Sequence, residues 1–252
     1  MKFNWTLTEK LGKIYIYGFF GNNDMLLGRN VVFMASWMVH LRIADLLMRE
    51  FSYVEKTEFV VGNIAPDSGI PSEDWSYYMP PKNVSHFWDE EKHIKLESYI
   101  EKYYTWEKRK GYSKKEDSFY LGYLTHLMTD MLWVDKIVIP CNQLHRKEKE
   151  ENKTKYIWDV KADWYDLDFV YLSKYPDFNA YQIFKNAVEF RNTYLDIFAE
   201  DAFDNRREYI VGFYGEKREN LEREYSYLNE GQMDKFVEMA AETVAGWVTG
   251  IK

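Results

Sequence analysis

The chain has 252 residues, of which 46% are hydrophobic and 18% aromatic, so it has ample apolar material for a buried core and we expect most of it to be ordered. Its 33 Lys and Arg are outnumbered by 41 Asp and Glu, and the resulting net charge of −8 excludes a general attraction to nucleic acid or to anionic lipid. The single cysteine, Cys141, excludes an intramolecular disulfide, so a reducing, cytoplasmic environment is the simpler expectation.

The first 33 residues differ in pattern from the rest. They alternate like a hairpin around Gly21–Asp24, whereas the chain after Met34 has helical period. We therefore treat residues 1–33 as an extension of a domain spanning 34–252, with Met34 as a candidate start site. The apolar stretch Leu11–Phe20 is too short to span a membrane and is not followed by a cleavage pattern, which argues against a signal peptide.

From Met34 to Phe51, apolar residues recur at intervals of three and four, which predicts an amphipathic helix that carries His40. The next apolar run is broken by proline, so we expect Asp67 at a helix end or in a loop. Prolines also mark the connection from there to His86 as irregular, and its length is typical of a functional loop.

A charged helix is expected over residues 89–110. Another begins after Ser113, where S-K-K-E forms a capping box, and we expect Pro140 to end it. This helix carries His126 and Asp130, which are four residues apart and therefore project from one face.

The second half of the chain has weaker patterns. Residues 144–155 are almost all charged and indicate a solvated helix end or a mobile loop. Further helices are indicated at 179–203, 216–230 and 232–249. We find no internal repeat and no linker that would separate domains, so we expect a single, multi-helical, all-α domain.

Five side chains combine into a candidate metal site: His40, Asp67, His86, His126 and Asp130. Neutral imidazole and carboxylate are the ligands that zinc uses when a site keeps an open catalytic position. We expect one ion on Asp67, His86, His126 and Asp130, and a second ion on His40 with Asp130 as a bridge. Zinc lowers the pKa of bound water to roughly 7, which supplies a hydroxide for phosphate-ester hydrolysis, and Asp67 is the candidate catalytic acceptor for the proton of that water.

Each of these residues also has a structural explanation. The alternatives are a core histidine at His40, a helix cap at Asp67, a loop residue at His86 and an i,i+4 ion pair between His126 and Asp130. Only the combination favours a metal. His93 and His145 lie among charged residues and are not expected to act, whereas Tyr77, Tyr78 and Trp88 flank the site and are candidates to line a substrate cleft.

Four ordered motifs carry a family resemblance: M-A-S-W-M-V-H-L-R-I-A-D (34–45), G-N-I-A-P-D (62–67), S-H-F (85–87) and Y-L-T-H-L-M-T-D (123–130). Together they resemble the bacterial zinc-dependent phospholipase C family, itself related to the P1-type nucleases. The resemblance implies an all-helical fold, a cluster of up to three zinc ions in a cleft and hydrolysis of a phosphodiester bond. The substrate it implies is a phosphate ester of a small molecule or a lipid headgroup.

The chain departs from the well-studied secreted members of that family. Their mature chain begins with a tryptophan whose amino group binds metal, but Trp37 is internal. Lys136 and Glu150 stand where two histidines hold a further zinc, so we expect one or two zinc ions, with iron or manganese as alternatives. Ser68 and Asn83 replace aromatics that grip choline, so the resemblance does not imply phosphatidylcholine as the substrate.

The favoured function is therefore a soluble zinc-dependent hydrolase of phosphate esters, in particular phosphodiesters, with no nucleic-acid partner and no transmembrane segment. A helical His-Asp phosphohydrolase ranks lower, because it would want a His-Asp dipeptide and the sequence has none. The alternative from a different class is a non-catalytic helical binding protein whose metal is structural or lost, since a fold alone does not establish a function.

Overall fold

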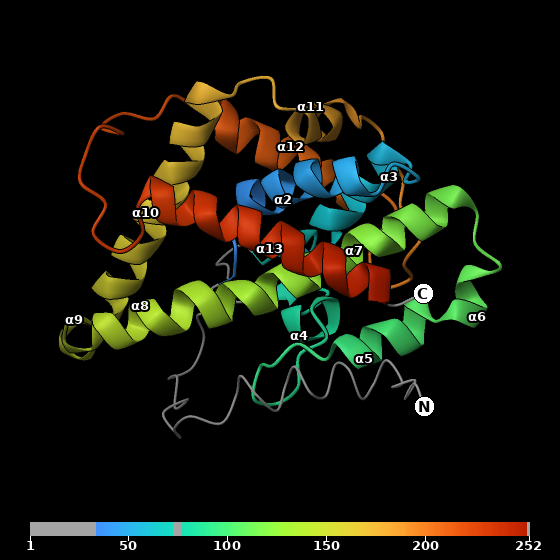
Figure 1. The fold of residues 1–252 in the computed structure, drawn as a ribbon, viewed down its shortest axis with the longest axis horizontal. Coiled ribbons are helices and arrows are strands. Elements are labelled where there is room, and N and C mark those ends of the chain that lie inside the picture. Colours follow the sequence, from blue (N-terminus) through green and yellow to red (C-terminus); the bar gives the residue numbers. More distant parts are fainter. Residues whose placement is uncertain (1–33, 73–76, 251–252) are drawn as a thin grey trace, which may run out of the picture.

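Helices form nearly all the regular structure of the chain. The structure, a computed structural model, describes residues 34–72 and 77–250, and over these residues it is all-α apart from one two-stranded sheet (Figure 1). The predicted hairpin within residues 1–33 lies outside the described residues. The elements in chain order are α2 (Trp37–Glu50), α3 (Lys56–Ile64), the 3-10 turn η1 (Ala65–Asp67), β1 (Ile70–Pro71), β2 (Tyr78–Met79), α4 (Lys82–Ser85), α5 (Leu96–Tyr99), the π-helix η2 (Ile100–Tyr104), α6 (Trp106–Arg109), α7 (Lys114–Trp133), the π-helix η3 (Val134–Val138), α8 (Ile139–Leu144), α9 (Arg146–Glu151), α10 (Lys153–Lys174), α11 (Asn179–Asn186), α12 (Ala202–Gly215) and α13 (Glu230–Gly250).

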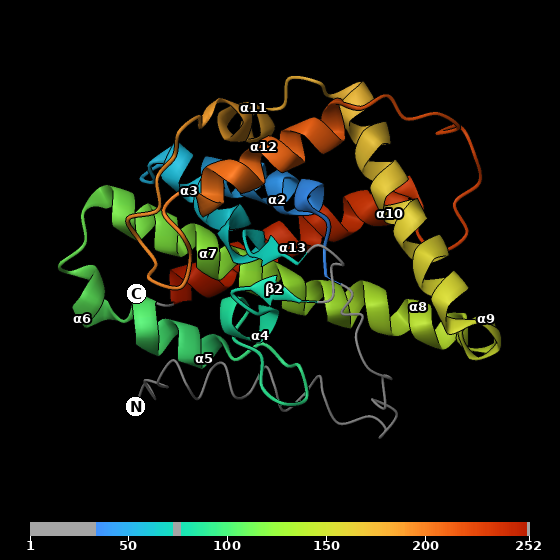
Figure 2. The same cartoon turned by 180° about the vertical axis from the view of Figure 1, so that it is seen from behind.

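Helices α3 and α7 pack closely at the centre of the fold, with α2 and α13 against them (Figures 1 and 2). Two glycines permit this approach. A Cβ added to Gly62 would lie 2.2 Å from the carbonyl oxygen of Phe119, and one added to Gly122 would lie 2.1 Å from that of Phe59. The contact between the two backbones therefore requires glycine on both helices, and it sets the spacing of the side chains that follow on each.

The helix after Ser113 begins as predicted. The Ser113 side chain accepts a hydrogen bond from the Glu116 N–H, and the Glu116 carboxylate accepts one from the Ser113 N–H, which completes the capping box. The prediction that Pro140 ends the helix was wrong. The chain passes from α7 through the π-helix η3 into α8, and Pro140 lies in the first turn of α8, where its missing N–H removes no essential hydrogen bond.

The helix predicted over 89–110 was wrong in its start and its continuity. Residues before Leu96 form a loop in which Lys92 has a φ of 67°, a left-handed conformation that interrupts a helix. Thr105 then separates η2 from α6 and caps α6 by accepting a hydrogen bond from the Lys108 N–H.

The second half of the chain differs most from expectation. Helix α10 was not predicted beyond its charged start, because its buried face mixes apolar residues with Asp163, Asp166 and Asp168 and so lacks a clean apolar stripe. The helix predicted over 179–203 ends at Asn186, and residues 216–229 are not helical. Only α13 matches its predicted range.

The antiparallel pair β1–β2 places Ile70 opposite Met79 and Pro71 opposite Tyr78, within the connection predicted to be irregular. Across residues 34–72 and 77–250, the structure contains no helix that is both long and apolar enough to cross a membrane.

Candidate metal centre

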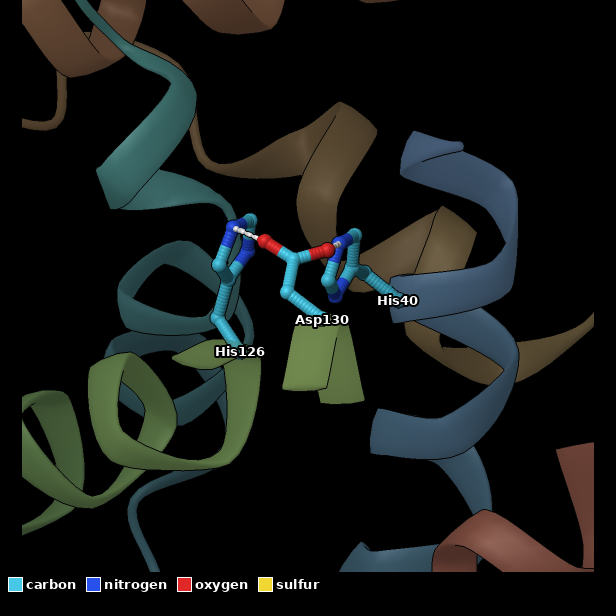
Figure 3. Close-up of side chains that lie close together, drawn as sticks. All are labelled: His40, His126 and Asp130. Carbon is cyan, nitrogen blue, oxygen red and sulfur yellow. Dashed lines mark ion pairs between the residues drawn. The ribbon is translucent and has the colours of Figure 1, made fainter. Parts of the chain in front are cut away.

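Four separate elements bring the five predicted ligand residues to one place. The Ser36 side chain caps the start of α2, and His40 follows one turn later. Helix α7 presents His126 and Asp130 toward it (Figure 3). The turn η1 ends at Asp67, and His86 follows directly after α4. The prediction that Asp67 lies at a helix end is therefore confirmed.

The carboxylate of Asp130 lies between histidines from different elements. Its Oδ1 is 3.2 Å from Nε2 of His40, whereas its Oδ2 is 3.1 Å from Nε2 of His126 and 3.9 Å from Nε2 of His86. The rings of His40 and His126 are stacked, 3.8 Å apart and within 5° of parallel. The two oxygens thus face two different sets of nitrogens, which is the arrangement that a bridging carboxylate needs.

Hydrogen bonds fix which nitrogen of the His126 and His86 rings faces Asp130. His126 Nδ1 is 2.7 Å from the carbonyl oxygen of Asn63. Because a carbonyl oxygen can only accept, Nδ1 is protonated and donates this hydrogen bond. His86 Nδ1 lies 2.9 Å from the Ser85 hydroxyl, and the Ser85 carbonyl oxygen in turn accepts a hydrogen bond from the Tyr123 hydroxyl. Such outer partners orient a metal-binding histidine and leave its Nε2 lone pair toward the ion.

The inward-facing atoms have no hydrogen bonds within the described part of the chain. They are Nε2 of His40, Nε2 of His86, Nε2 of His126 and Oδ2 of Asp130. All four side chains are fully buried or nearly so. Buried polar atoms without partners cost about 1–3 kcal/mol each, and their convergence on one point is what a cation site requires.

Protonation in the cluster suits a cation. Burial lowers the pKa of His86 to about 4, and burial also lowers the pKa of His40, so both rings are neutral near pH 7. Burial alone would raise the pKa of Asp130, but the adjacent His126 and His40 outweigh it and hold that pKa well below its usual range. Burial also acts to lower the pKa of His126, but the charge of Asp130 outweighs it and raises that pKa above its ordinary value. Zinc binds neutral imidazole and ionised carboxylate, so metal binding requires His126 to release its Nε2 proton.

Asp67 carries the second carboxylate of the cluster. Its Oδ1 is 3.0 Å from Nζ of Lys82 and 3.5 Å from Nε2 of His86. Burial acts to raise the pKa of Asp67, but the charge of Lys82 prevails and leaves that pKa well below the ordinary value. Asp67 is therefore ionised near neutral pH.

The donor atoms fall into two groups of three that can each surround an ion. His40, His126 and Asp130 form one group, and Asp67, His86 and His126 form the other. His126 belongs to both, but its Nε2 has one lone pair and can bind only one ion at a time. The geometry therefore brings together all five predicted residues, with His126 shared between the two groups.

The residues predicted to be uninvolved lie elsewhere. His145 pairs with Glu148 at 2.9 Å on the surface. His93 is 3.5 Å from Asp89 in an exposed group that also contains Glu91, and the Lys95 ammonium already neutralises that group at 2.8 Å from Asp89.

The flanking aromatic residues divide into two kinds. The ring of Trp88 is 5.5 Å from that of His86, and the ring of Tyr78 is 5.5 Å from Nζ of Lys82, so both lie beside the centre. Tyr77 is 61% exposed. That they line a substrate cleft stays a prediction.

Sequence reasoning missed the groups that support the ligands. Four groups contact the ligands because the fold brings them there: the Asn63 carbonyl, the Ser85 hydroxyl, the Lys82 ammonium and the Ala35 N–H. The Ala35 N–H donates to Asp130 Oδ1 at 3.1 Å. Two are backbone groups, for which side-chain identity gives no signal. The quoted motifs do contain Ala35, Asn63 and Ser85, so their place beside the candidate ligands was the available hint.

Comparison with known proteins adds an independent finding. The family model described as zinc-dependent phospholipase C matches residues 39–238, a range that includes all five candidate ligands. No curated protein matches the chain, and neither does any solved structure.

Proposed function

Because the chain belongs to the zinc-dependent phospholipase C family, we propose that it hydrolyses phosphodiesters, with zinc held by its own buried cluster. The proposed ligands are His40, Asp67, His86, His126 and Asp130. The observation that carries the proposal is the Asp130 carboxylate, whose two oxygens face separate histidine nitrogens that lack hydrogen bonds. The substrate we propose is a phosphate ester of a small molecule or a lipid headgroup.

We assign the cluster as one or two zinc sites joined by Asp130. His126 and His86 share the Oδ2 side with Asp67, while His40 lies on the Oδ1 side. The Oδ2 side offers more ligands, so it is the stronger of the two sites. On the Oδ1 side, the Ala35 N–H already donates a hydrogen bond to Oδ1, which leaves that side with fewer free lone pairs to bind a metal.

Bound zinc supplies Lewis acidity, which polarises a phosphoryl oxygen and lowers the pKa of water. The residues of the chain do the rest. Asp130 and the histidines provide ligand atoms at fixed positions for the metal. Outer hydrogen bonds hold the rings of His126 and His86 in place. Asp67 remains our candidate for the acceptor of the proton from the attacking water, because it is the less enclosed of the two carboxylates and is ionised. The lowered pKa of Asp67 makes it a weak base. We therefore expect Asp67 to contribute at least as much by positioning the attacking water as by accepting its proton.

Elemental analysis of protein purified without an affinity metal column tests the proposal directly. We expect one or two equivalents of zinc in the wild type and loss of at least one in His126→Ala. His145→Ala is the matched control, because that histidine lies outside the cluster and pairs with Glu148, so the variant should retain all the zinc. Hydrolysis of bis(p-nitrophenyl) phosphate should follow the zinc content.

Removal of the metal separates catalysis from a purely structural role. Treatment with a chelator should abolish hydrolysis, and added zinc should restore it. Wild-type protein that contains no zinc and takes none up would refute the proposal. A zinc-loaded protein that hydrolyses no phosphodiester and unfolds on chelation would support the non-catalytic alternative instead.

A further inference from the structure

A buried arginine on α12 contacts two segments that carry proposed metal ligands. The Nη2 atom of Arg206 donates a hydrogen bond to the carbonyl oxygen of Gly69 at 2.6 Å, two residues after Asp67. The central carbon of the guanidinium also lies 5.9 Å from the ring centroid of Trp37, the first residue of α2, three residues before His40. Helix α12 supplies no proposed ligand of its own, so Arg206 is connected to the centre through these two segments.

The charge of Arg206 is not matched by a carboxylate. Only 8% of the residue is exposed. Among the residues that the structure describes, its Nε has no hydrogen-bond partner, and no carboxylate oxygen lies within 4.0 Å of the guanidinium. The ring of Tyr209, 5.3 Å away, provides a cation–π contact. A buried charge without an opposite charge is costly, so an ion pair that stabilises α12 does not account for this arginine.

The next residue, Arg207, shows how a structural arginine of the same helix is placed. It is equally buried, at 8% exposed, but its Nε lies 2.7 Å from Asp204 and its Nη2 lies 3.5 Å from Glu208. Its Nη1 donates to the carbonyl oxygen of Lys185 on α11 at 3.4 Å. Arg207 is therefore neutralised within α12 and bonded to α11, which makes it a matched control for Arg206.

The segment that follows Asp67 is held from two sides at Gly69. On one side, the Gly69 carbonyl accepts the hydrogen bond from Arg206. On the other side, a Cβ added to Gly69 would lie 3.1 Å from the carbonyl oxygen of Pro80 and 3.4 Å from Cβ of Tyr78, so the Gly69 backbone packs closely against β2 and the residue after it. One residue separates Gly69 from Asp67, so a shift of the Gly69 backbone moves the Asp67 carboxylate. A displacement of about 1 Å is enough to impair a reactive site.

We propose that Arg206 is a positioning residue for the metal centre, because it fixes the turn that carries Asp67 against the start of α2. The inference rests on the proposed function, since it concerns the ligands of that site. Arg206 contacts the backbone beside Asp67 and acts through it. Its loss should therefore weaken the group formed by Asp67, His86 and His126. The expected loss of zinc affinity is about 10- to 100-fold, as for other residues that orient a ligand from outside.

Competition with a chelator measures the zinc affinity of the full chain. Arg206→Met keeps an apolar stem and removes the donor, so it should weaken the binding of one zinc equivalent by about 10- to 100-fold. Arg207→Met removes an equally buried arginine of the same helix and should leave zinc affinity unchanged. Arg206→Lys should restore most of the affinity, because a single donor atom contacts the Gly69 carbonyl.

A double-mutant cycle tests whether Arg206 acts through Asp67. Asp67→Asn alone should weaken zinc binding, because it removes the charge of a proposed ligand. Adding Arg206→Met to Asp67→Asn should then weaken binding by less than about twofold more, the margin within which unrelated effects are indistinguishable. Two losses that multiply in full would overturn the inference, since they would show that Arg206 acts independently of Asp67.

Hydrogen exchange of the metal-free proteins, followed by mass spectrometry, provides a readout that depends on neither metal nor turnover. In Arg206→Met, the amides of residues 68–70 should exchange about tenfold faster, because a hydrogen bond from a charged donor is lost. They should be unchanged in Arg207→Met, and equal exchange in the two variants would overturn the inference. Circular dichroism establishes that each variant is folded, and Arg206→Gln takes the place of Arg206→Met if the methionine variant is not.

The two readouts separate this inference from the proposed function. Faster exchange and weaker zinc binding in Arg206→Met, in a protein whose zinc-loaded wild type hydrolyses no phosphodiester, would support the positioning role and refute the proposed function. Hydrolysis by the wild type, together with zinc affinity that Arg206→Met does not change, would support the proposed function and overturn the positioning role.

Discussion

The buried carboxylates of α10 and the buried carboxylate Asp130 of α7 differ in their hydrogen-bond partners. On α10, Asp163 accepts hydrogen bonds from Arg223 at 2.7 Å and from the Tyr227 N–H at 2.8 Å, and Asp168 accepts them from Ser36 at 2.8 Å and Tyr214 at 2.7 Å. On α7, Asp130 is equally buried, but its Oδ2 has no hydrogen-bond donor and faces histidine nitrogens that have none either.

The difference separates structural acids from candidate functional ones. A buried carboxylate whose oxygens all accept hydrogen bonds is fully accounted for by the fold. One whose oxygen faces other acceptors is stable only if a proton or a cation lies between them. Burial and residue type are the same in both regions, so the partners alone make the distinction.

The largest expected effect comes from Asp130. Asp130→Asn removes the negative charge shared by both proposed sites, so the protein should lose zinc, and phosphodiester hydrolysis should fall by more than about 100-fold, the upper end for loss of an outer-shell partner. Asp168→Asn, an equally buried acid, should retain its zinc. Equal loss of zinc in both variants would remove the distinction drawn between the two regions.

A change in backbone packing should have the next largest effect. Gly122→Ala forces a Cβ to within 2.1 Å of the Phe59 carbonyl oxygen, so α3 and α7 must separate. We expect a loss of about 1–3 kcal/mol in the free energy of unfolding, together with weaker zinc binding, because Asn63 orients His126 across this contact. Urea titration measures the first and competition with a chelator the second.

Gly246→Ala is the matched control for that change. A Cβ on Gly246 of α13 meets no atom within 4 Å, so alanine should raise stability by roughly 0.5–1 kcal/mol through its better helix propensity. If the two substitutions had the same effect, close packing at Gly122 would not be the cause.

Among the acids of α10, Asp163→Ala should affect stability and leave zinc unchanged. It removes acceptors from Arg223, which is partly exposed, and from the Tyr227 N–H. The expected cost is about 1–2 kcal/mol, measured by urea denaturation. Asp159→Ala, at an exposed ion pair of the same helix, should cost less than about 0.5 kcal/mol. Loss of zinc from the Asp163 variant would show that the two regions are coupled.

A pH dependence of stability is expected from Asp168. Burial raises the pKa of this carboxyl to about 7, above the value of about 3.9 for an unfolded chain. The stabilisation from its protonated form is therefore complete below the unfolded pKa and is lost as the pH rises through about 7. We expect this part of the pH dependence, less than about 1.4 kcal/mol per pH unit, to disappear in Asp168→Asn. Unfolding free energies at pH 5 and pH 8 measure it, and a variant with an unchanged difference would contradict it.

Sequence by itself determined the local features of this protein. The capping box at Ser113 and the shared face of His126 and Asp130 depend on contacts three or four residues apart, so spacing was enough to predict them. The all-α class followed from the same helical periods. The five candidate ligands were identifiable because histidine and aspartate are distinctive in chemistry and occur in ordered motifs.

Only the tertiary structure decided what depends on distant contacts. Helix α10 was obscured because its buried acids are paired with residues some fifty to sixty positions away, such as Arg223, and a local pattern cannot contain that information. The effect of Pro140 was predicted wrongly because a π-helix precedes it. Pro140 therefore lies in the first turn of α8, where proline does not end a helix. Likewise, the Asn63 carbonyl reaches and orients His126 only once α3 and α7 have packed together.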